Sequence, residues 1–117
     1  MSEAPLFDPS VFRGLCSELG NEDAAEVLQV FFADAPRKMT LIMSDTTDRP
    51  SIKRAAHSIK SSAATFGFAK LSALARDLES GIAGMSAPQL DECTGTLRQS
   101  FEQAAEFART NLLQPAY

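Results

Sequence analysis

The sequence predicts an all-α protein: an antiparallel up-and-down bundle of four long helices with an additional short helix at the N-terminus. Apolar residues recur at intervals of three and four along nearly the whole chain, and no segment alternates as a β-strand does. Proline, glycine and capping residues stand at the ends of these periodic segments. The connections are short, which favours antiparallel neighbours. Because the chain has 117 residues and 44% hydrophobic content, we expect one domain spanning residues 1–117.

The first two helices are expected on either side of Gly20. Asp8-Pro9 is a helix start signal. The apolar residues of this short helix are Val11, Phe12, Leu15 and Leu19. Gly20 ends it, and Asn21 can cap the second helix. The apolar residues of the second helix are Leu28, Phe31, Phe32, Ala35, Met39 and Ile42. Pro36 lies inside this stripe, and because the stripe keeps its phase there, we expect a kink rather than two helices.

A third helix is expected after the break DTTDRPS at residues 45–51. Pro50 restarts helical structure, which runs to Phe66 and ends at Gly67. A fourth helix follows almost at once. Its inward residues are Phe68, Leu71, Ala75, Leu78 and Ile82.

The last helix follows the turn GIAGMSAP at residues 81–88. Ser86 and Gln89 have the spacing of a capping box, in which each side chain bonds the main chain of the other. Apolar residues then recur at intervals of three and four. They are Leu90, Cys93, Leu97, Phe101, Ala104, Ala108 and Leu112.

Composition excludes several classes of function. The net charge of -4 and the pI near 4.9 argue against nucleic acid as a ligand, because phosphate binding needs a basic surface. The glycines form neither a P-loop nor a dinucleotide fingerprint. Cys16 and Cys93 are expected to be reduced and buried, since their spacing fits no zinc site. With no membrane-length apolar run and no signal peptide, we expect a cytoplasmic protein.

His57 is the only histidine of the chain, and a helical wheel places it on the surface. The core side of its helix is formed by residues that lie within about 40° of one direction at 100° per residue. They are Ile52, Ala56, Ile59, Ala63 and Phe66. His57 lies roughly 140° away on this wheel, which speaks against a buried, hydrogen-bonded core histidine. An idle surface histidine remains an alternative.

The neighbours of His57 favour a functional surface. One to two turns along the helix lie Lys60, Ser61 and Ala64, of which two are small and leave the ring accessible. Between Arg49 and Arg76 there is no acidic residue. The basic residues of this range are Arg49, Lys53, Arg54, Lys60, Lys70 and Arg76. A solvated helix face explains such a run, but an acidic, phosphorylated partner would also require it.

The segment AHSIKSSAATFGFAKLSALARDLES, residues 56–80, resembles the signature of histidine-containing phosphotransfer (HPt) domains. The matching residues are Ala56, His57, Ile59, Lys60, Ser61, Ser62, Gly67 and Glu79. Length, helix count and the position of the histidine on the third helix are similar too. Two positions differ from the commonest form, because Ser61 stands where glycine is frequent and Thr65 where asparagine or serine is frequent.

The resemblance implies that His57 accepts a phosphoryl group from an aspartyl phosphate on a receiver domain and passes it to another receiver. It implies that Lys60 offsets phosphoryl charge, that Glu79 orients the ring, and that Ser61 leaves room or donates a hydrogen bond. The partner-binding residues expected from it are Lys53, Arg54, Ser61, Ala64, Gly67 and Phe68. The partners would be receiver domains of response regulators and hybrid histidine kinases.

The same resemblance implies no cofactor and no metal of the chain's own, because the receiver supplies Mg²⁺. Without a nucleotide motif the chain is expected to be a carrier rather than a kinase, and a monomer. Met1 and the tail NLLQPAY favour a free-standing protein over a piece of a longer kinase.

Two rival functions follow from the same residues. A purely non-catalytic module would dock receivers through the helical surface without chemistry. An acid–base enzyme would use His57 with Glu79, although no pocket-forming loop or further catalytic group is visible. Replacing His57 distinguishes docking from phosphotransfer, because docking does not need the imidazole.

Overall fold

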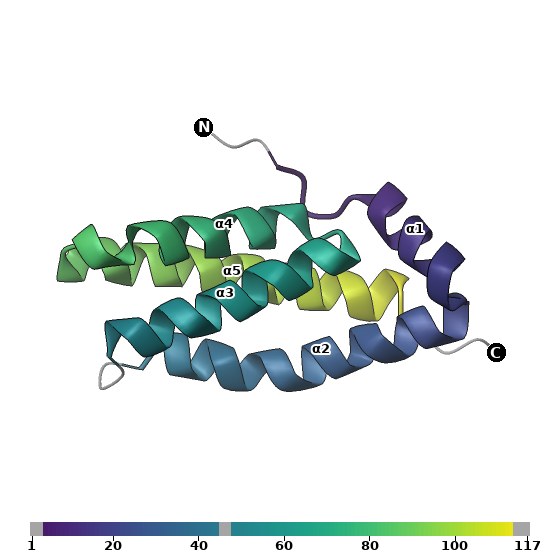
Figure 1. Ribbon diagram of the computed structural model, residues 1–117, viewed down its shortest axis with the longest axis horizontal. Coiled ribbons are helices and arrows are strands. Elements are labelled where there is room, and N and C mark those ends of the chain that lie inside the picture. The colour runs from purple at the N-terminus through teal and green to yellow at the C-terminus, as the bar shows by residue number, and fades with distance from the viewer. Residues whose placement is uncertain (1–3, 45–47, 114–117) are drawn as a thin grey trace.

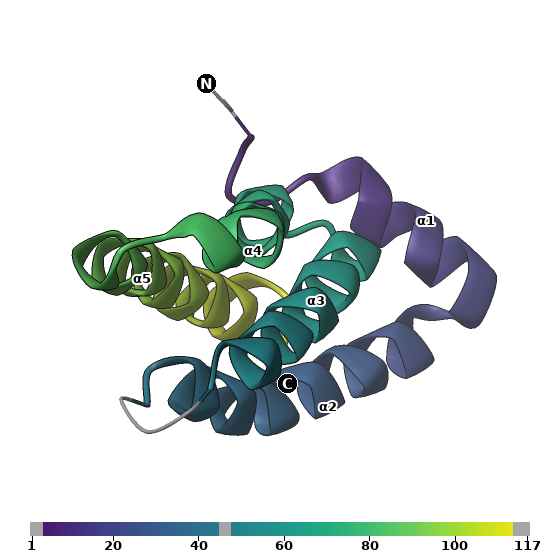
Figure 2. The same cartoon turned by 60° about the vertical axis from the view of Figure 1, so that its left-hand side comes forward.

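The computed structural model describes residues 4–44 and 48–113, and within them it contains helices and no strand. The elements are α1 (Pro9–Leu19), α2 (Asn21–Ile42), α3 (Arg49–Phe66), α4 (Ala69–Gly81), a 3₁₀ turn η1 (Ile82–Gly84) and α5 (Ala87–Asn111). Helices α2 to α5 run up and down beside one another, and α1 packs at one end (Figure 1). Figure 2 shows α3 between α2 and α4. The predicted all-α bundle is confirmed.

The start of α2 differs from the prediction. Asp8 caps α1 by accepting a hydrogen bond from the main-chain N–H of Ser10 at 3.0 Å. The chain then turns at Gly20, with φ of 89°, and α2 begins immediately. Asn21 is therefore the first residue of the helix, and no side chain caps it. Pro36 lies inside one continuous helix, so the proline does not divide α2.

The ends of α3 and the start of α5 follow their sequence signals. Asp48 caps α3 by accepting from the N–H of Ser51 at 2.8 Å. Gly67 ends the helix in the left-handed region, with φ of 94°, which favours a residue without Cβ. The predicted capping box is present before α5. The main-chain N–H of Ser86 donates to the side-chain oxygen of Gln89 at 2.8 Å, and the main-chain N–H of Gln89 donates to the hydroxyl of Ser86 at 3.2 Å.

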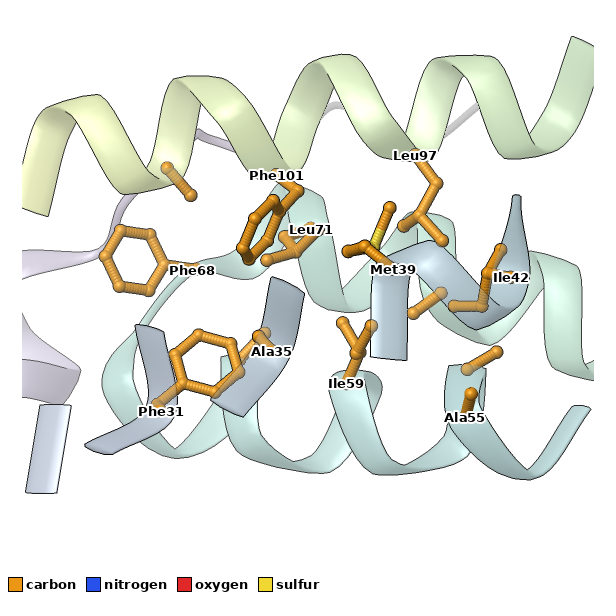
Figure 3. Packing of buried hydrophobic residues seen from close by; sticks show 14 of the residues in the cluster. Phe31, Ala35, Met39, Ile42, Ala55, Ile59, Phe68, Leu71, Leu97 and Phe101 are labelled. Atoms are coloured by element: carbon orange, nitrogen blue, oxygen red, sulfur yellow. The ribbon is translucent and has the colours of Figure 1, made fainter. Parts of the chain in front are cut away.

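The core lies between the four long helices, and Figure 3 shows their apolar side chains pointing toward one another. The five residues expected on the core side of α3 are all buried, and Ala55 joins them. Cys16 and Cys93 are free, but they are partly exposed rather than buried as expected. Within the described residues, no helix is long and apolar enough to cross a membrane.

The segment before α1 crosses the connection between α3 and α4. The N–H of Asp8 donates to the carbonyl of Gly67 at 2.7 Å, and the N–H of Lys70 donates to the carbonyl of Pro5 at 2.9 Å. Phe7 inserts its ring beside Phe68, with centroids 5.2 Å apart. These contacts fix the N-terminal segment beside the C-terminal end of α3.

Candidate functional site

His57 lies on the outward side of α3, and its side chain is 59% exposed. Its neighbour Ala56 and the residue two positions on, Ile59, are fully buried. The ring therefore projects to solvent from a helix whose opposite side is held in the core. The orientation predicted by the helical wheel is confirmed.

Glu79 of α4 meets the ring of His57. The Nδ1 atom of His57 lies 2.6 Å from Oε2 of Glu79. Because an ionised carboxylate only accepts hydrogen bonds, Nδ1 must carry the proton in this contact. The lone pair of the neutral ring then lies on Nε2. The carboxylate thus selects one tautomer and leaves the other nitrogen with its lone pair free.

Lys60 completes the site by binding the other oxygen of the same carboxylate. Its Nζ lies 2.7 Å from Oε1 of Glu79, and the Glu79 side chain is only 19% exposed. The hydrogen bond from Lys60 lowers the pKa of Glu79 below its ordinary value; partial desolvation opposes this shift, and the hydrogen bond from His57 adds to it. Glu79 is therefore ionised at neutral pH, as the tautomer of His57 requires.

The residues around the ring leave it open. Ser61 and Ala64, on the turns that follow His57, are exposed and small. Lys53 and Arg54, on the turn that precedes it, are exposed as well. The guanidinium of Arg54 donates a hydrogen bond to the hydroxyl of Ser51 at 3.0 Å. The structure thus places four of the six expected partner-binding residues on the accessible surface.

The structure overturns one of the expected partner-binding residues, Phe68, and leaves only main-chain contact to a second, Gly67. Phe68 is fully buried, and its ring packs against Phe7, Phe32 and Phe107, so it serves the core and cannot face a partner. Gly67 is buried as well, beneath the main chain of Asp8. It ends α3, admits the N-terminal segment, and lines the groove between α3 and α4 with its main chain alone.

The long basic run divides into separate parts. Arg49 is the first residue of α3, and its guanidinium donates to the carbonyl oxygens of Ile82 and Met85. It therefore ties α3 to the turn before α5. Lys53, Arg54 and Lys60 lie along α3 near His57, so only part of the run can act on whatever approaches the ring.

Sequence reasoning missed Ser72, which links α4 to α3 beside the site. Its hydroxyl donates to the main-chain carbonyl of Lys60 at 2.9 Å. Ser72 precedes Glu79 by seven residues, which is about two helical turns and places both on one side of α4. That spacing was a usable signal, but the partner of the hydroxyl depends on how the two helices pack.

The described residues contain no group of three or more His, Cys, Asp and Glu side chains that could hold a metal ion. Beside His57, the carboxylate of Glu79 and the ammonium of Lys60 bind each other. This arrangement can orient an imidazole and balance negative charge near it.

Comparison with known proteins assigns the family. The sequence model of the Hpt domain matches residues 26–107, which include most of α2, all of α3 and α4, and most of α5. No curated protein and no solved structure matches the chain. His57, Lys60 and Glu79 all fall within the matched range. The chain belongs to the Hpt domain family, whose members take part in the phosphotransfer of two-component signalling and generally interact with receiver domains.

Proposed function

We propose that this chain is a phosphoryl carrier of a phosphorelay, in which His57 accepts a phosphoryl group from an aspartyl phosphate on one receiver domain and passes it to another. The observation that carries this proposal is the 2.6 Å contact between Nδ1 of His57 and the carboxylate of Glu79. An exposed imidazole with one nitrogen held as a donor presents the other as a nucleophile.

The chemistry of the proposed step balances at the ring. The lone pair on Nε2 attacks phosphorus, the bond between phosphorus and the donor's carboxylate oxygen breaks, and the electron pair leaves with the aspartate. The proton stays on Nδ1, so the product ring carries a positive charge beside the negative carboxylate of Glu79. Onward transfer reverses these events with a second receiver. The Glu79 carboxylate therefore stabilises the ring charge that forms when the phosphoryl group is bound.

Lys60 and Ser61 have supporting parts in the proposal. The ammonium of Lys60 lies next to the site and offsets charge on the phosphoryl oxygens, while the small side chain of Ser61 leaves room for the approaching donor. Lys53 and Arg54 supply positive charge for an acidic partner surface. We expect the receiver to bring the Mg²⁺ that the reaction needs, and the chain to act as a monomer in the cytoplasm.

The test is phosphoryl transfer from a panel of labelled, phosphorylated receiver domains to the wild type and to His57→Gln. We expect label on the wild type alone, labile in acid and stable in alkali, as a phosphohistidine is. Because the side chain is 59% exposed, the substitution leaves the fold intact, which circular dichroism checks. If both proteins bind a receiver and neither takes up label, the chain is a docking module and the proposal is wrong.

A further inference from the structure

A groove of about 580 Å³ lies beside the site, between α3 and α4, and the N-terminal segment forms one end of it. Most of the residues that line it are small. They are Ala4, Ser61, Ala64, Gly67, Ala69, Ser72 and Ala73. The groove reaches Lys60 but neither His57 nor Glu79, so it adjoins the phosphorylation site without containing it. A side chain from a partner docked over His57 has room to enter it.

Two cations, Lys60 and Arg76, line the groove, and they differ in how closely each is paired with a carboxylate. Lys60 is committed to Glu79 at 2.7 Å. Arg76 of α4 is 62% exposed, and its ion pair is with the adjacent Asp77, at 3.9 Å between Nε and Oδ1. An exposed pair at that distance contributes little. Arg76 thus brings a guanidinium to the groove with most of its donors available.

Asp8 is the one acidic residue that lines the groove, and its Oδ1 atom is engaged at the start of α1. Asp8 accepts hydrogen bonds from the N–H and the hydroxyl of Ser10, at 3.0 and 2.7 Å. These bonds lower the pKa of Asp8 below its ordinary value, and they hold the carboxylate as the cap of α1. Among the described residues, no carboxylate closer than that of Asp77 is paired with Arg76.

We infer that Arg76 is a specificity-determining residue for phosphotransfer, and that it binds a carboxylate of the partner that lies beside the partner's phosphoryl group. This inference rests on the proposed function. A planar guanidinium binds a carboxylate through two parallel hydrogen bonds, which adds geometric selection to charge. Any donor of a phosphoryl group presents negative charge at this surface, and the groove that Arg76 lines holds two cations, Lys60 and Arg76, against one acid, Asp8.

Arg76 is assigned to docking rather than to the phosphoryl group because of its position. It precedes Glu79 by three residues, about one turn of α4, and it faces the groove that His57 does not line. Lys60 connects the groove to the ring, because it lines the groove and also binds Glu79, the carboxylate that contacts His57. We therefore expect Arg76 to act on association and Lys60 to act on the transferred group.

The experiment measures association and transfer separately. Stopped-flow mixing with a phosphorylated receiver gives the association rate constant, and single-turnover transfer in the preformed complex gives the chemical step. We expect Arg76→Glu to slow association roughly tenfold or more at low salt, and we expect the difference to shrink as ionic strength rises to about 0.15 M. Arg76→Lys should recover part of the loss, because it keeps the charge and loses the two-pronged geometry. The chemical step should stay within about twofold of wild type.

Arg98→Glu is the matched control, because Arg98 is an exposed arginine on α5 that does not line the groove. It should leave both rates near those of wild type. If Arg76→Glu and Arg98→Glu slow association equally, the effect is one of net charge and the inference is wrong. If Arg76→Glu slows only the chemical step, Arg76 contacts the phosphoryl group and the docking assignment is wrong.

Failure of the proposed function gives a different result. A wild-type chain that takes up no label contradicts phosphotransfer, whereas calorimetric binding of the same receiver to wild type and Arg76→Glu still measures the docking role. Equal affinities in that measurement would overturn the part assigned to Arg76.

Discussion

Glu79 binds His57 with one carboxylate oxygen and Lys60 with the other, at 2.6 Å and 2.7 Å. One acid on α4 therefore joins the imidazole and the ammonium of two residues that lie one turn apart on α3. The contact with Lys60 keeps the carboxylate ionised, and the ionised carboxylate keeps the proton of His57 on Nδ1. The ring nitrogen that keeps its lone pair is thus determined by a residue on a neighbouring helix.

Removing the Glu79 carboxylate should change the proportions of the two neutral tautomers of His57. In Glu79→Ala we expect the Nδ1-protonated form to lose its predominance, because no acceptor remains for that proton. Nitrogen-15 NMR of the imidazole measures the two tautomers directly. We also expect the rate of transfer to fall by about tenfold or more, as for other residues that orient a histidine.

Glu102→Ala is the control for this prediction, because Glu102 is an exposed acid on α5 that pairs with Arg98. It should alter neither the NMR signals of His57 nor the rate. Unchanged tautomers in Glu79→Ala would show that the contact with Glu79 does not govern the ring, even if the rate fell.

The lowered pKa of Glu79 also makes stability depend on pH. Because the pKa in the folded state lies below the ordinary value of 4.5, chiefly through the hydrogen bond from Lys60, the carboxylate stabilises the fold fully above that value. This contribution is lost as pH falls through the folded pKa. We expect wild type to exceed Glu79→Gln in free energy of unfolding at pH 7, and the gap to narrow as pH falls from 4.5 through the folded pKa of Glu79.

Urea unfolding at a series of pH values measures both proteins. The quantity to follow is the difference in free energy of unfolding between the two proteins. Hydrogen bonds from Arg37 and Lys38 lower the pKa of Asp34 to about 2, so protonation of Asp34 in acid also destabilises the fold. Asp34 is present in both proteins and its effect cancels. A gap that stayed constant from pH 7 to pH 3 would contradict the assigned shift.

The sequence predicted the parts of the site that depend on one helix. The exposure of His57 follows from the apolar positions of α3, and the end of that helix follows from Gly67. The capping box before α5 needed only the spacing of Ser86 and Gln89. In each case the contacts lie within about one or two turns, so periodicity and local chemistry suffice.

Contacts between helices could not be predicted in the same way. Helical periodicity says which side of α4 faces inward, but not its register along α3, so the bond from Ser72 to Lys60 was missed. The role of Glu79 came from the family resemblance rather than from periodicity. Phe68 was expected both in the core and at the partner surface. It is fully buried and packs against Phe7, so it belongs to the core. Residues 4–8 have no helical period, and so their position over Gly67 was not foreseen.

Ser100 marks a place where the core can be improved. Its hydroxyl is buried and has no hydrogen-bond partner among the described residues. An unsatisfied buried hydroxyl costs about 1–3 kcal/mol, and alanine is the better helix former. We expect Ser100→Ala to raise the free energy of unfolding by about 1 kcal/mol, measured by urea denaturation.

Ser80→Ala is the comparison for that variant, because the Ser80 hydroxyl is exposed and bonds the carbonyl of Arg76 within α4. It should change stability by less than about 0.5 kcal/mol. Equal changes in the two variants would mean that helix propensity alone is responsible, and that the Ser100 hydroxyl is not destabilising.

Gly67 is expected to be the least replaceable glycine near the site. At its φ of 94° a residue with Cβ costs about 1–2 kcal/mol. A Cβ there would also lie 2.7 Å from the carbonyl oxygen of Asp8, so the N-terminal segment would have to move. We expect Gly67→Ala to lower the free energy of unfolding by about 2 kcal/mol or more and to weaken the hydrogen-exchange protection of the Asp8 amide.

Two further variants separate the causes of that loss. Gly95→Ala, inside α5 where a Cβ meets nothing within 4 Å, should stabilise the protein by about 0.5–1 kcal/mol. Gly67→Asn tolerates the left-handed backbone better than alanine, but it brings the same Cβ toward Asp8. If Gly67→Asn were as stable as wild type, the close approach of the N-terminal segment would not constrain this position, and backbone strain alone would explain the need for glycine.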